Sequence, residues 1–270
     1  MQGSSRAAAT ASRDAFRDAL VAGATPGLLG DELFAVLATL DSSSTLRRAL
    51  ADSSREAAEK QALAERLFTG KVSDATVRVL SVVSGERWST ERDLTDTIEA
   101  LAVESVIATA EAGDRADRVE DELFRFERLV AADSGLHAAL ATQTAPTDSR
   151  VGLVDDLLSG KVAEQTLTLA RQAVSHPRGR RFDRTIETYL DLAARRREQQ
   201  TATVTSALPL SDRERDRLAA GLATIYGGKV HVNTVVDPRV MGGIKVEIGD
   251  ELIDGTVLRK LEGARRAMGA

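Results

Sequence analysis

Few residues in this sequence have the types and spacing that catalysis requires. The three histidines, His137, His176 and His231, are far apart in the chain and have no histidine close by, and the chain has no cysteine. Catalysis by a nucleophile, base and acid needs several such groups in mutual contact. We therefore expect no catalytic residue, no metal site and no cofactor, and we interpret each histidine as an ordinary surface or packing residue.

The stretch GGIKVEIGDELIDGT, residues 242–256, combines glycines with carboxylates and could in principle hold an ion. A calcium loop needs oxygen ligands at alternate positions, and Asp250, Glu251 and Asp254 do not supply that series. A phosphate loop needs G-x-x-x-x-G-K followed by Ser or Thr, whereas the run from Gly221 to Lys229 has the wrong spacing. The stretch therefore favours turns and caps over ligand chemistry.

A structural interpretation accounts for the same stretch. Gly242 and Gly243 follow DPRVM at an expected hairpin connection, and Gly249 ends a strand. Asp254 is placed to cap a last helix, VLRKLEGARRAM, with Gly255 and Thr256 in the tight entry to it.

Composition favours closely packed helices. Of 270 residues, 43% are hydrophobic but only six are Phe, two Tyr and one Trp, so Ala, Leu and Val dominate the apolar content. Ala and Leu are among the best helix formers. The absence of cysteine is compatible with a reducing compartment. The N-terminus lacks the apolar core of a signal peptide, and no run is long enough to span a membrane.

The charge distribution is uneven. The formal net charge is −5, which argues against general polyanion binding, yet Arg171–Arg197 contains eight arginines and only three acids. A solvated helix face is the simplest interpretation, and an acidic partner surface is the alternative. The residues that would face such a partner are Arg178, Arg180, Arg181, Arg195, Arg196 and Arg197.

The first 200 residues contain an internal repeat. DELFAVLATLDSSSTLRRALA (31–51) matches DELFRFERLVAADSGLHAALA (121–141) at an offset of 90, and without a gap Gly70-Lys71-Val72 falls on Gly160-Lys161-Val162. The ungapped register indicates a duplication. Apolar spacing of three and four residues predicts a helical bundle in each copy. Helices are expected at 4–22, 28–40, 43–51, 55–68, 73–84, 89–111, 116–131, 133–141, 147–158, 162–175 and 180–199.

From about residue 201 the period changes from helical to alternating. TATVTSAL places Val204, Ser206 and Leu208 on one face, and two further strands are expected in KVHVNTVVD and IKVEI. Between them, Ser211 and Glu214 form a capping box for a helix that should turn Leu218, Leu222 and Ile225 inward. The predicted fold is mainly α: bundle units at 1–112 and 113–200, then a small α/β module at 201–270.

The C-terminal residues resemble a known family. TSALPLS (205–211) and KVHVNTVVDPRVMGGIKVEIGDELIDGTVLRKLE (229–262) are similar to the delta subunit of F-type ATP synthases, a relative of the mitochondrial oligomycin-sensitivity-conferring protein. The residues that carry this signature, with mainly structural roles, are Pro238, Gly242, Gly243, Gly249, Asp250, Ile253, Asp254 and Gly255. A family member usually has one bundle, so two bundles resemble the enlarged actinobacterial form.

The resemblance implies a non-catalytic stator subunit that joins the catalytic head to the peripheral stalk and resists rotation. A bundle, expected at 115–200, would receive N-terminal helices of the alpha subunits, and residues 205–270 would meet the b subunit. The protein would lie at the cytoplasmic face of the cell membrane, held there only indirectly through the complex, without binding nucleic acid. A helical adaptor for an acidic partner or nucleic acid is the alternative, and a small enzyme using the glycine-rich loops is a third.

Overall fold

The computed structural model separates the chain into two compact units, Met1–Ala193 and Ala194–Ala270, and each is considered by itself. The structure describes residues 3–141, 146–199, 201–226, 230–240, 242–249 and 251–255.

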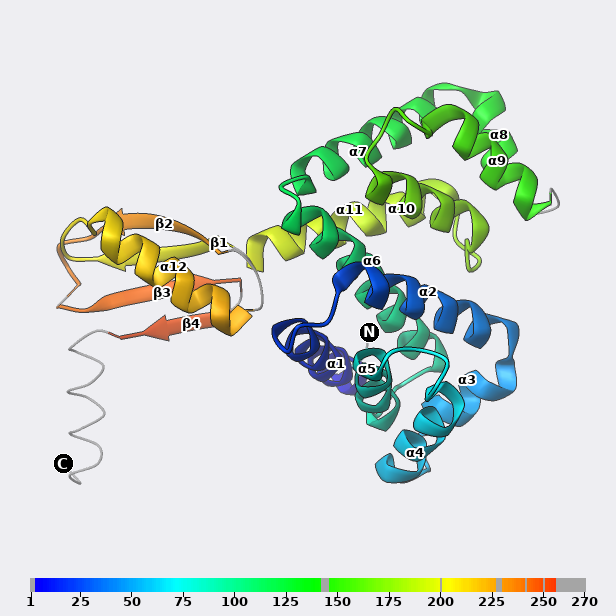
Figure 1. Ribbon diagram of the computed structural model, residues 1–270, viewed down its shortest axis with the longest axis horizontal. Helices are drawn as coiled ribbons and strands as arrows, with labels where there is room; N and C mark the ends of the chain where they lie inside the picture. Colours follow the sequence, from blue (N-terminus) through cyan, green and yellow to red (C-terminus); the bar gives the residue numbers. More distant parts are fainter. Residues whose placement is uncertain are drawn as a thin grey trace. The chain divides into compact units, whose positions relative to one another are not determined.

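The first unit is helical throughout its described elements (Figure 1). In chain order the helices are α1 (Gly3–Val21), α2 (Pro26–Ser42), α3 (Ser44–Ala51), α4 (Ala57–Phe68), α5 (Asp74–Gly85), α6 (Glu91–Ala112), α7 (Ala116–Ala132), α8 (Ser134–Ala141), α9 (Thr147–Leu158), α10 (Glu164–Ser175) and α11 (Phe182–Gln199), whose last residues belong to the second unit. Each helix predicted from the sequence between residues 4 and 199 is present, and no end differs by more than two residues.

A carboxylate clasp recurs in both copies of the repeat. In the first, Glu32 on α2 accepts hydrogen bonds from the backbone N–H of Ser73 at 2.8 Å and from the Thr76 hydroxyl. In the second, Glu122 on α7 accepts them from the N–H of Ala163 at 2.8 Å and the Thr166 hydroxyl at 2.6 Å. Each residue of the second clasp lies 90 positions after its counterpart in the first. The hydrogen bonds therefore repeat with the same offset as the sequence.

Each clasp satisfies an N–H at the start of a helix, where the first four amide donors lack partners within the helix. The loop before each clasp turns at a glycine with positive φ, 75° at Gly70 and 72° at Gly160. Such a φ is readily available only without a Cβ.

Helix α6 serves both copies. It packs against α1, α2 and α5 of the first copy and against α7 and α10 of the second. The offset of 90 places α1 on α6 and α6 on α11, so α6 closes the first bundle and opens the next. Figure 1 shows it lying between the two groups of helices. Its buried residues surround the helix, and they include Leu94, Thr97, Leu101 and Ser105 as well as Ile98, Glu99, Ala102 and Val106.

One hydrophobic core runs through both copies. It contains buried side chains from α1 through to Ala193 of α11, with the Phe126 and Phe182 rings in edge-to-face contact at 5.4 Å between centroids. Aromatic pairs favour this geometry because the positive ring edge meets the negative face. The two copies are therefore packed as one body.

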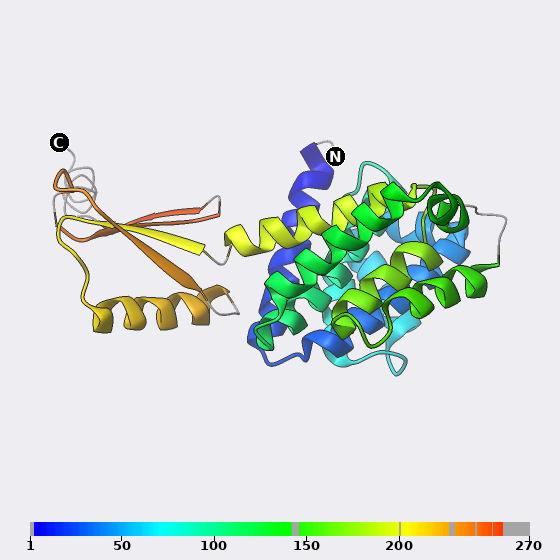
Figure 2. The same ribbon diagram turned by 90° about the horizontal axis from the view of Figure 1, so that it is seen from above.

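The second unit contains a four-stranded sheet and one described helix beyond the end of α11. Its elements are β1 (Thr201–Ser206), α12 (Asp212–Tyr226), β2 (His231–Val236), β3 (Ile244–Ile248) and β4 (Glu251–Asp254). The strand order is β2-β1-β3-β4, with β1 parallel to β2 and antiparallel to β3. Helix α12 lies on one face of this sheet (Figure 2). The capping box is present: Ser211 N–H donates to Glu214 at 2.9 Å.

The predicted hairpin between KVHVNTVVD and IKVEI is wrong, because β1 lies between β2 and β3. A parallel pair needs a crossover connection, which α12 supplies between β1 and β2. The hairpin instead joins β3 to β4, where Ile248 pairs with Glu251. The sequence indicated turns and caps after Gly249, so β4 was missed.

Two inward side chains were also predicted incorrectly. Leu208 lies beyond the end of β1 and is exposed, whereas Val204 and Ser206 are buried as expected. Ile225 is 60% exposed, although Leu222 on the same helix is buried. Asp254 is the last residue of β4, and the helix predicted to follow it lies outside the described residues.

Candidate interaction surfaces

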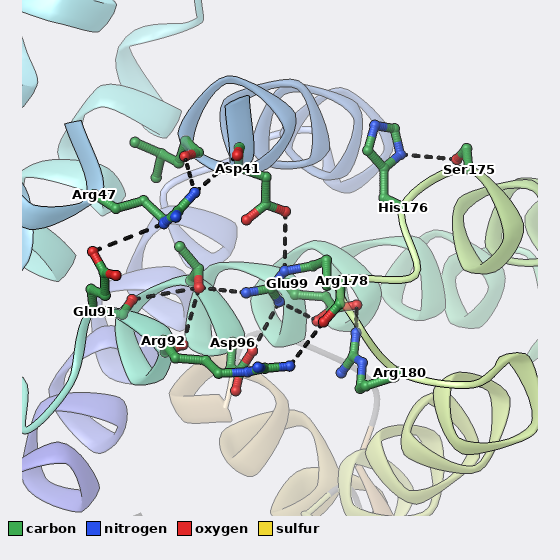
Figure 3. Close-up of polar contacts among 12 residues, drawn as sticks. Asp41, Arg47, Glu91, Arg92, Asp96, Glu99, Ser175, His176, Arg178 and Arg180 are labelled. Atoms are coloured by element: carbon green, nitrogen blue, oxygen red, sulfur yellow. Dashed lines mark hydrogen bonds and ion pairs between the residues drawn. The ribbon is translucent and has the colours of Figure 1, made fainter. Parts of the chain in front are cut away.

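The segment between α10 and α11 carries the first of the predicted arginines, and Arg178 turns inward. Its side chain is only 7% exposed, and it forms ion pairs with Glu99 at 2.6 Å, Asp96 at 2.9 Å and Asp41 at 3.1 Å (Figure 3). Its backbone has a φ of 50°, which side-chain-bearing residues rarely adopt.

Glu99 on α6 is the centre of this cluster. It accepts hydrogen bonds from Arg178 and Arg180 and from the hydroxyl of Tyr189 on α11 at 3.2 Å. Asp41, Asp96 and Glu99 come from the first copy, and Arg178, Arg180 and Tyr189 come from the second. We call these six residues the joint cluster.

Burial and charge act in opposite directions in the joint cluster. Burial alone would lower the pKa of Arg178, but the nearby carboxylates of Glu99, Asp41 and Asp96 outweigh it and raise that pKa. Burial and the Glu99 charge raise the pKa of Tyr189 well above 10.0. The arginine therefore stays charged and the phenol neutral at physiological pH, which suits a structural contact.

A polar cavity of about 390 Å³ borders the joint cluster. Arg47, Glu91, Arg92, Thr95 and His176 line it together with Asp41 and Arg178. Basic and acidic side chains are mixed around it, and Arg92 donates to the carbonyl of Arg178 at 2.8 Å. This mixture of charges favours no single sign of ligand.

The other predicted arginines lie differently. Arg181 is exposed, pairs with Asp183 at 3.1 Å and approaches His137. Arg195 and Arg197 line a cleft of about 700 Å³ in the second unit with Thr201, Thr203 and Glu247. Arg195, Arg196 and Arg197 all have interactions within the chain. Arg178 and Arg180 are thus engaged with Glu99, and an acidic partner at the remaining four stays a prediction.

The signature residues of the second unit lie at its turns and sheet edge. Gly242 and Gly243 have φ of 68° and 78°, and Gly249 has a φ of 53° just after β3. The N–H of Gly255 donates to the carbonyl of Ile244 at 2.9 Å. Pro238 follows β2 in a turn, Ile253 and Asp254 belong to β4, and Asp250 lies outside the described residues.

The second unit also has an apolar groove of about 600 Å³ beside α12. Leu218, Leu222 and Ile225 form one wall, and Ile244, Val246 and Ile253 form the other. The sequence predicted β3 and α12 but missed β4, which carries Ile253, and it expected Ile225 to be covered, so it did not predict this groove.

Among the described residues, no group of three or more His, Asp or Glu side chains is placed to hold a metal ion. His137, His176 and His231 fall in or next to α8, α10 and β2 respectively. No helix within the described ranges is long and apolar enough to cross a membrane.

Comparison with known proteins identifies the family. The sequence model of the family described as "ATP synthase delta (OSCP) subunit" matches residues 98–268, which begin inside α6 and reach through the second copy and the sheet unit. This chain belongs to the ATP synthase delta (OSCP) family. The family is a structural, non-catalytic component of ATP synthase.

Relatives cover both copies of the repeat. The chain is 45% identical to "ATP synthase subunit delta" of Kineococcus radiotolerans over 91% of this chain and 89% of that protein. It is 42% identical to the protein of that name from Streptomyces avermitilis over 98% of both, and 41% identical to that of Thermobifida fusca over 99% of both. The resemblance to enlarged actinobacterial delta subunits is confirmed.

Sequence reasoning found the repeat but not its internal contacts. Glu32 and Glu122 stood in the aligned DELF segments without an assigned role, and their partners lie 41 to 44 residues further along. Thr76 and Thr166 are separated by the same 90 residues as Glu32 and Glu122, and this shared offset was the signal that could have suggested the clasp.

Proposed function

We propose that this chain is the stator subunit that links the catalytic head of an F-type ATP synthase to its peripheral stalk. It takes part in no bond-making step. It holds the head against rotation, so that turning of the rotor is converted into conformational change at the nucleotide sites. The family match over residues 98–268 carries this proposal, because it includes both the second bundle and the sheet unit.

The second bundle is the proposed site for N-terminal helices of the alpha subunits. An amphipathic helix binds through apolar side chains spaced along one face, so its receptor must expose apolar side chains. Phe124 of α7 is one such side chain in the second copy, and Leu129, about 140° further round the same helix, is exposed on its other side. The first copy has Val21 and Leu28 exposed near the α1–α2 turn, so it is the matched competitor.

The sheet unit is the proposed site for the b subunit, and the complex holds the chain at the cytoplasmic face of the membrane. Binding both head and stalk through one chain benefits from effective concentration, since the second contact forms within an existing complex. The exposed Arg181 and the arginines at the end of α11 would favour an acidic stalk segment.

The test is recovery of partners from detergent-solubilised membranes of the source cell by the full-length chain. We expect both alpha and b subunits in the eluate. The paired change Phe124→Asp with Leu129→Asp should lower alpha recovery at least about tenfold, as loss of two apolar anchors does in other interfaces. Val21→Asp with Leu28→Asp is the matched control and should leave it unchanged.

If Val21→Asp with Leu28→Asp lowers alpha recovery and Phe124→Asp with Leu129→Asp does not, the alpha contact belongs to the first copy. Recovery of neither partner under conditions that preserve an intact synthase would contradict the stator role. Binding of the full chain to random DNA with a steep salt dependence would instead support the adaptor alternative.

A further inference from the structure

Strand β2 forms one edge of the sheet, and one of its two sides has no partner strand among the described residues. The backbone N–H and C=O groups of successive residues in a strand point alternately to its two sides. The N–H of Asp237, the residue after β2, donates to the carbonyl of Ser206 on β1 at 2.9 Å. The residues of β2 that direct their backbone groups away from β1 are therefore Val232, Thr234 and Val236.

The free side of β2 lacks the features that usually keep an edge strand from pairing. Charged side chains, proline, bulges and short length protect such edges. The sequence of β2, HVNTVV, contains no Lys, Arg, Asp, Glu or Pro, and its six residues pair with β1 in an unbroken register. The opposite edge strand, β4, has only four residues and carries the exposed Glu251. The sheet is thus protected at β4 and open at β2.

The side chains along the free side are β-branched and uncharged. Val232, Thr234 and Val236 are in register with three buried residues of β1, so they lie on the face of the sheet that α12 covers (Figure 2). Val236 is 47% exposed, and Val235, on the other face, is 46% exposed. A further strand beside β2 would remove apolar surface of both valines from water, which is favourable.

We propose that an extended segment of the peripheral-stalk partner binds along β2 as a fifth strand of this sheet. An extended chain presents unpaired N–H and C=O groups in the alternation that this edge requires, whereas a helix uses its backbone groups internally. On the face covered by α12, side chains of the added strand would meet Val232, Thr234 and Val236. That face of the segment should therefore carry uncharged, small or β-branched residues.

The size of the contact favours a tethered partner over a second copy of this chain. Six residues at about 3.3 Å each make an edge about 20 Å long, and a sheet with its side chains is about 10 Å thick, so the pairing covers about 200 Å² on each strand. A stable free complex buries at least about 1,200 Å² in total. A contact this small persists where another interface keeps the partners together. The inference therefore rests on the proposed function, in which one complex holds head and stalk beside this chain.

The first test removes one hydrogen-bond donor from the free side of β2. Thr234→Pro deletes an N–H that points away from β1, and proline is tolerated on that side of an edge strand. In recovery from solubilised membranes, the full-length variant should yield at least about tenfold less b subunit, because the added strand loses a hydrogen bond and meets the proline ring. Recovery of alpha subunits should not change. Thr234→Val keeps the N–H and the β-branched shape, so it is the matched control and should recover both partners.

A second test leaves the backbone unchanged, so it does not depend on how the sheet accommodates proline. The chain has no native cysteine, so a photoreactive maleimide can be attached at a single introduced thiol. The full chain labelled at Thr234→Cys should crosslink to the b subunit when it is irradiated with solubilised membranes. Leu252→Cys, at a position 56% exposed on the opposite edge strand β4, is the control and should give clearly less of that product.

The outcomes separate this inference from the proposed function. Undiminished recovery of the b subunit by Thr234→Pro, or equal crosslinking from Thr234→Cys and Leu252→Cys, would overturn the added strand and leave the stator role in place. A crosslink between two copies of this chain would overturn it in favour of a second copy. Recovery of neither partner by the unchanged chain would contradict the stator role and this inference with it.

Discussion

The two copies of the repeat share a clasp but differ in how their second helices are covered. In α2, Gly30 lies so close to α6 that an added Cβ would be 3.2 Å from the Cβ of Ser105, and Phe34 beside it is buried. In α7 the corresponding residues are Glu120 and Phe124, and Phe124 is 54% exposed.

This difference separates what a duplicated bundle must keep from what it can change. The clasp and the glycine turn before it determine how the helices connect, and both copies retain them. The outer face of the second helix sets what the bundle can bind. The first copy uses that face internally against α6, whereas the second presents an aromatic side chain to solvent.

The largest difference in stability should come from truncating Phe34 or Phe124, which occupy corresponding positions in the two copies. Phe34→Ala should lower the free energy of unfolding by about 3–5 kcal/mol, because it leaves a cavity at the α2 packing surface. Phe124→Ala should lower it by about 1 kcal/mol or less, since just over half of that side chain is in solvent. Urea denaturation of the full chain measures both, and similar losses would remove the distinction between the copies.

Breaking the joint cluster should have an effect of similar or slightly smaller size. Glu99→Gln leaves Arg178 buried beside fewer negative charges, and loss of one partner of a buried ion pair typically costs about 3–5 kcal/mol. The change should be measured by denaturation at neutral pH. Glu187→Gln, which removes a surface pair with Arg184, is the control and should have little effect.

A larger side chain at the close approach between α2 and α6 should reduce stability by less than the two preceding changes. Gly30→Leu should destabilise the fold by about 1–3 kcal/mol, because neither the Ser105 side chain nor the Ala102 carbonyl can move away freely. Gly152→Leu in α9 is the matched change, since an added Cβ there meets nothing within 4 Å. It should stabilise its helix slightly, and a loss equal to that of Gly30→Leu would contradict the close packing of α2.

The clasp should give the smallest effect, and one that depends on pH. Burial alone would raise the pKa of Glu122, but hydrogen bonds from Thr166 and Ala163 outweigh it and lower the pKa below 4.5. A carboxylate with a lowered pKa stabilises the fold above its unfolded pKa, and the stabilisation disappears as pH falls through the folded value. Glu122→Gln should cost about 1–2 kcal/mol at pH 7.

Near pH 3, Glu122→Gln should lower the free energy of unfolding by clearly less than at pH 7. Denaturation midpoints at the two pH values provide the measurement, with Glu122→Gln compared with the unchanged chain in each buffer. A cost that stays constant with pH would show that the Glu122 charge does not hold the clasp.

The helices were predictable because their apolar spacing is local, and breaks such as Gly113 lie near their ends. The sheet order was not, because β1 and β2 pair across the whole of α12, and no local pattern reports a pairing over that distance. Burial of Arg178 was hidden for the same reason. Its partners Asp41 and Glu99 lie more than 75 residues away, and the sequence shows only a cluster of arginines.

The shared position of α6 has a consequence for the order in which the protein forms during synthesis. The first bundle is complete once residue 112 has left the ribosome, and N-terminal parts of a chain generally fold first. Helices α7 to α11 then emerge beside a helix that is already in place. The first helix of the second copy is thus already folded. The apolar faces of α7 to α11 can pack against it while translation continues.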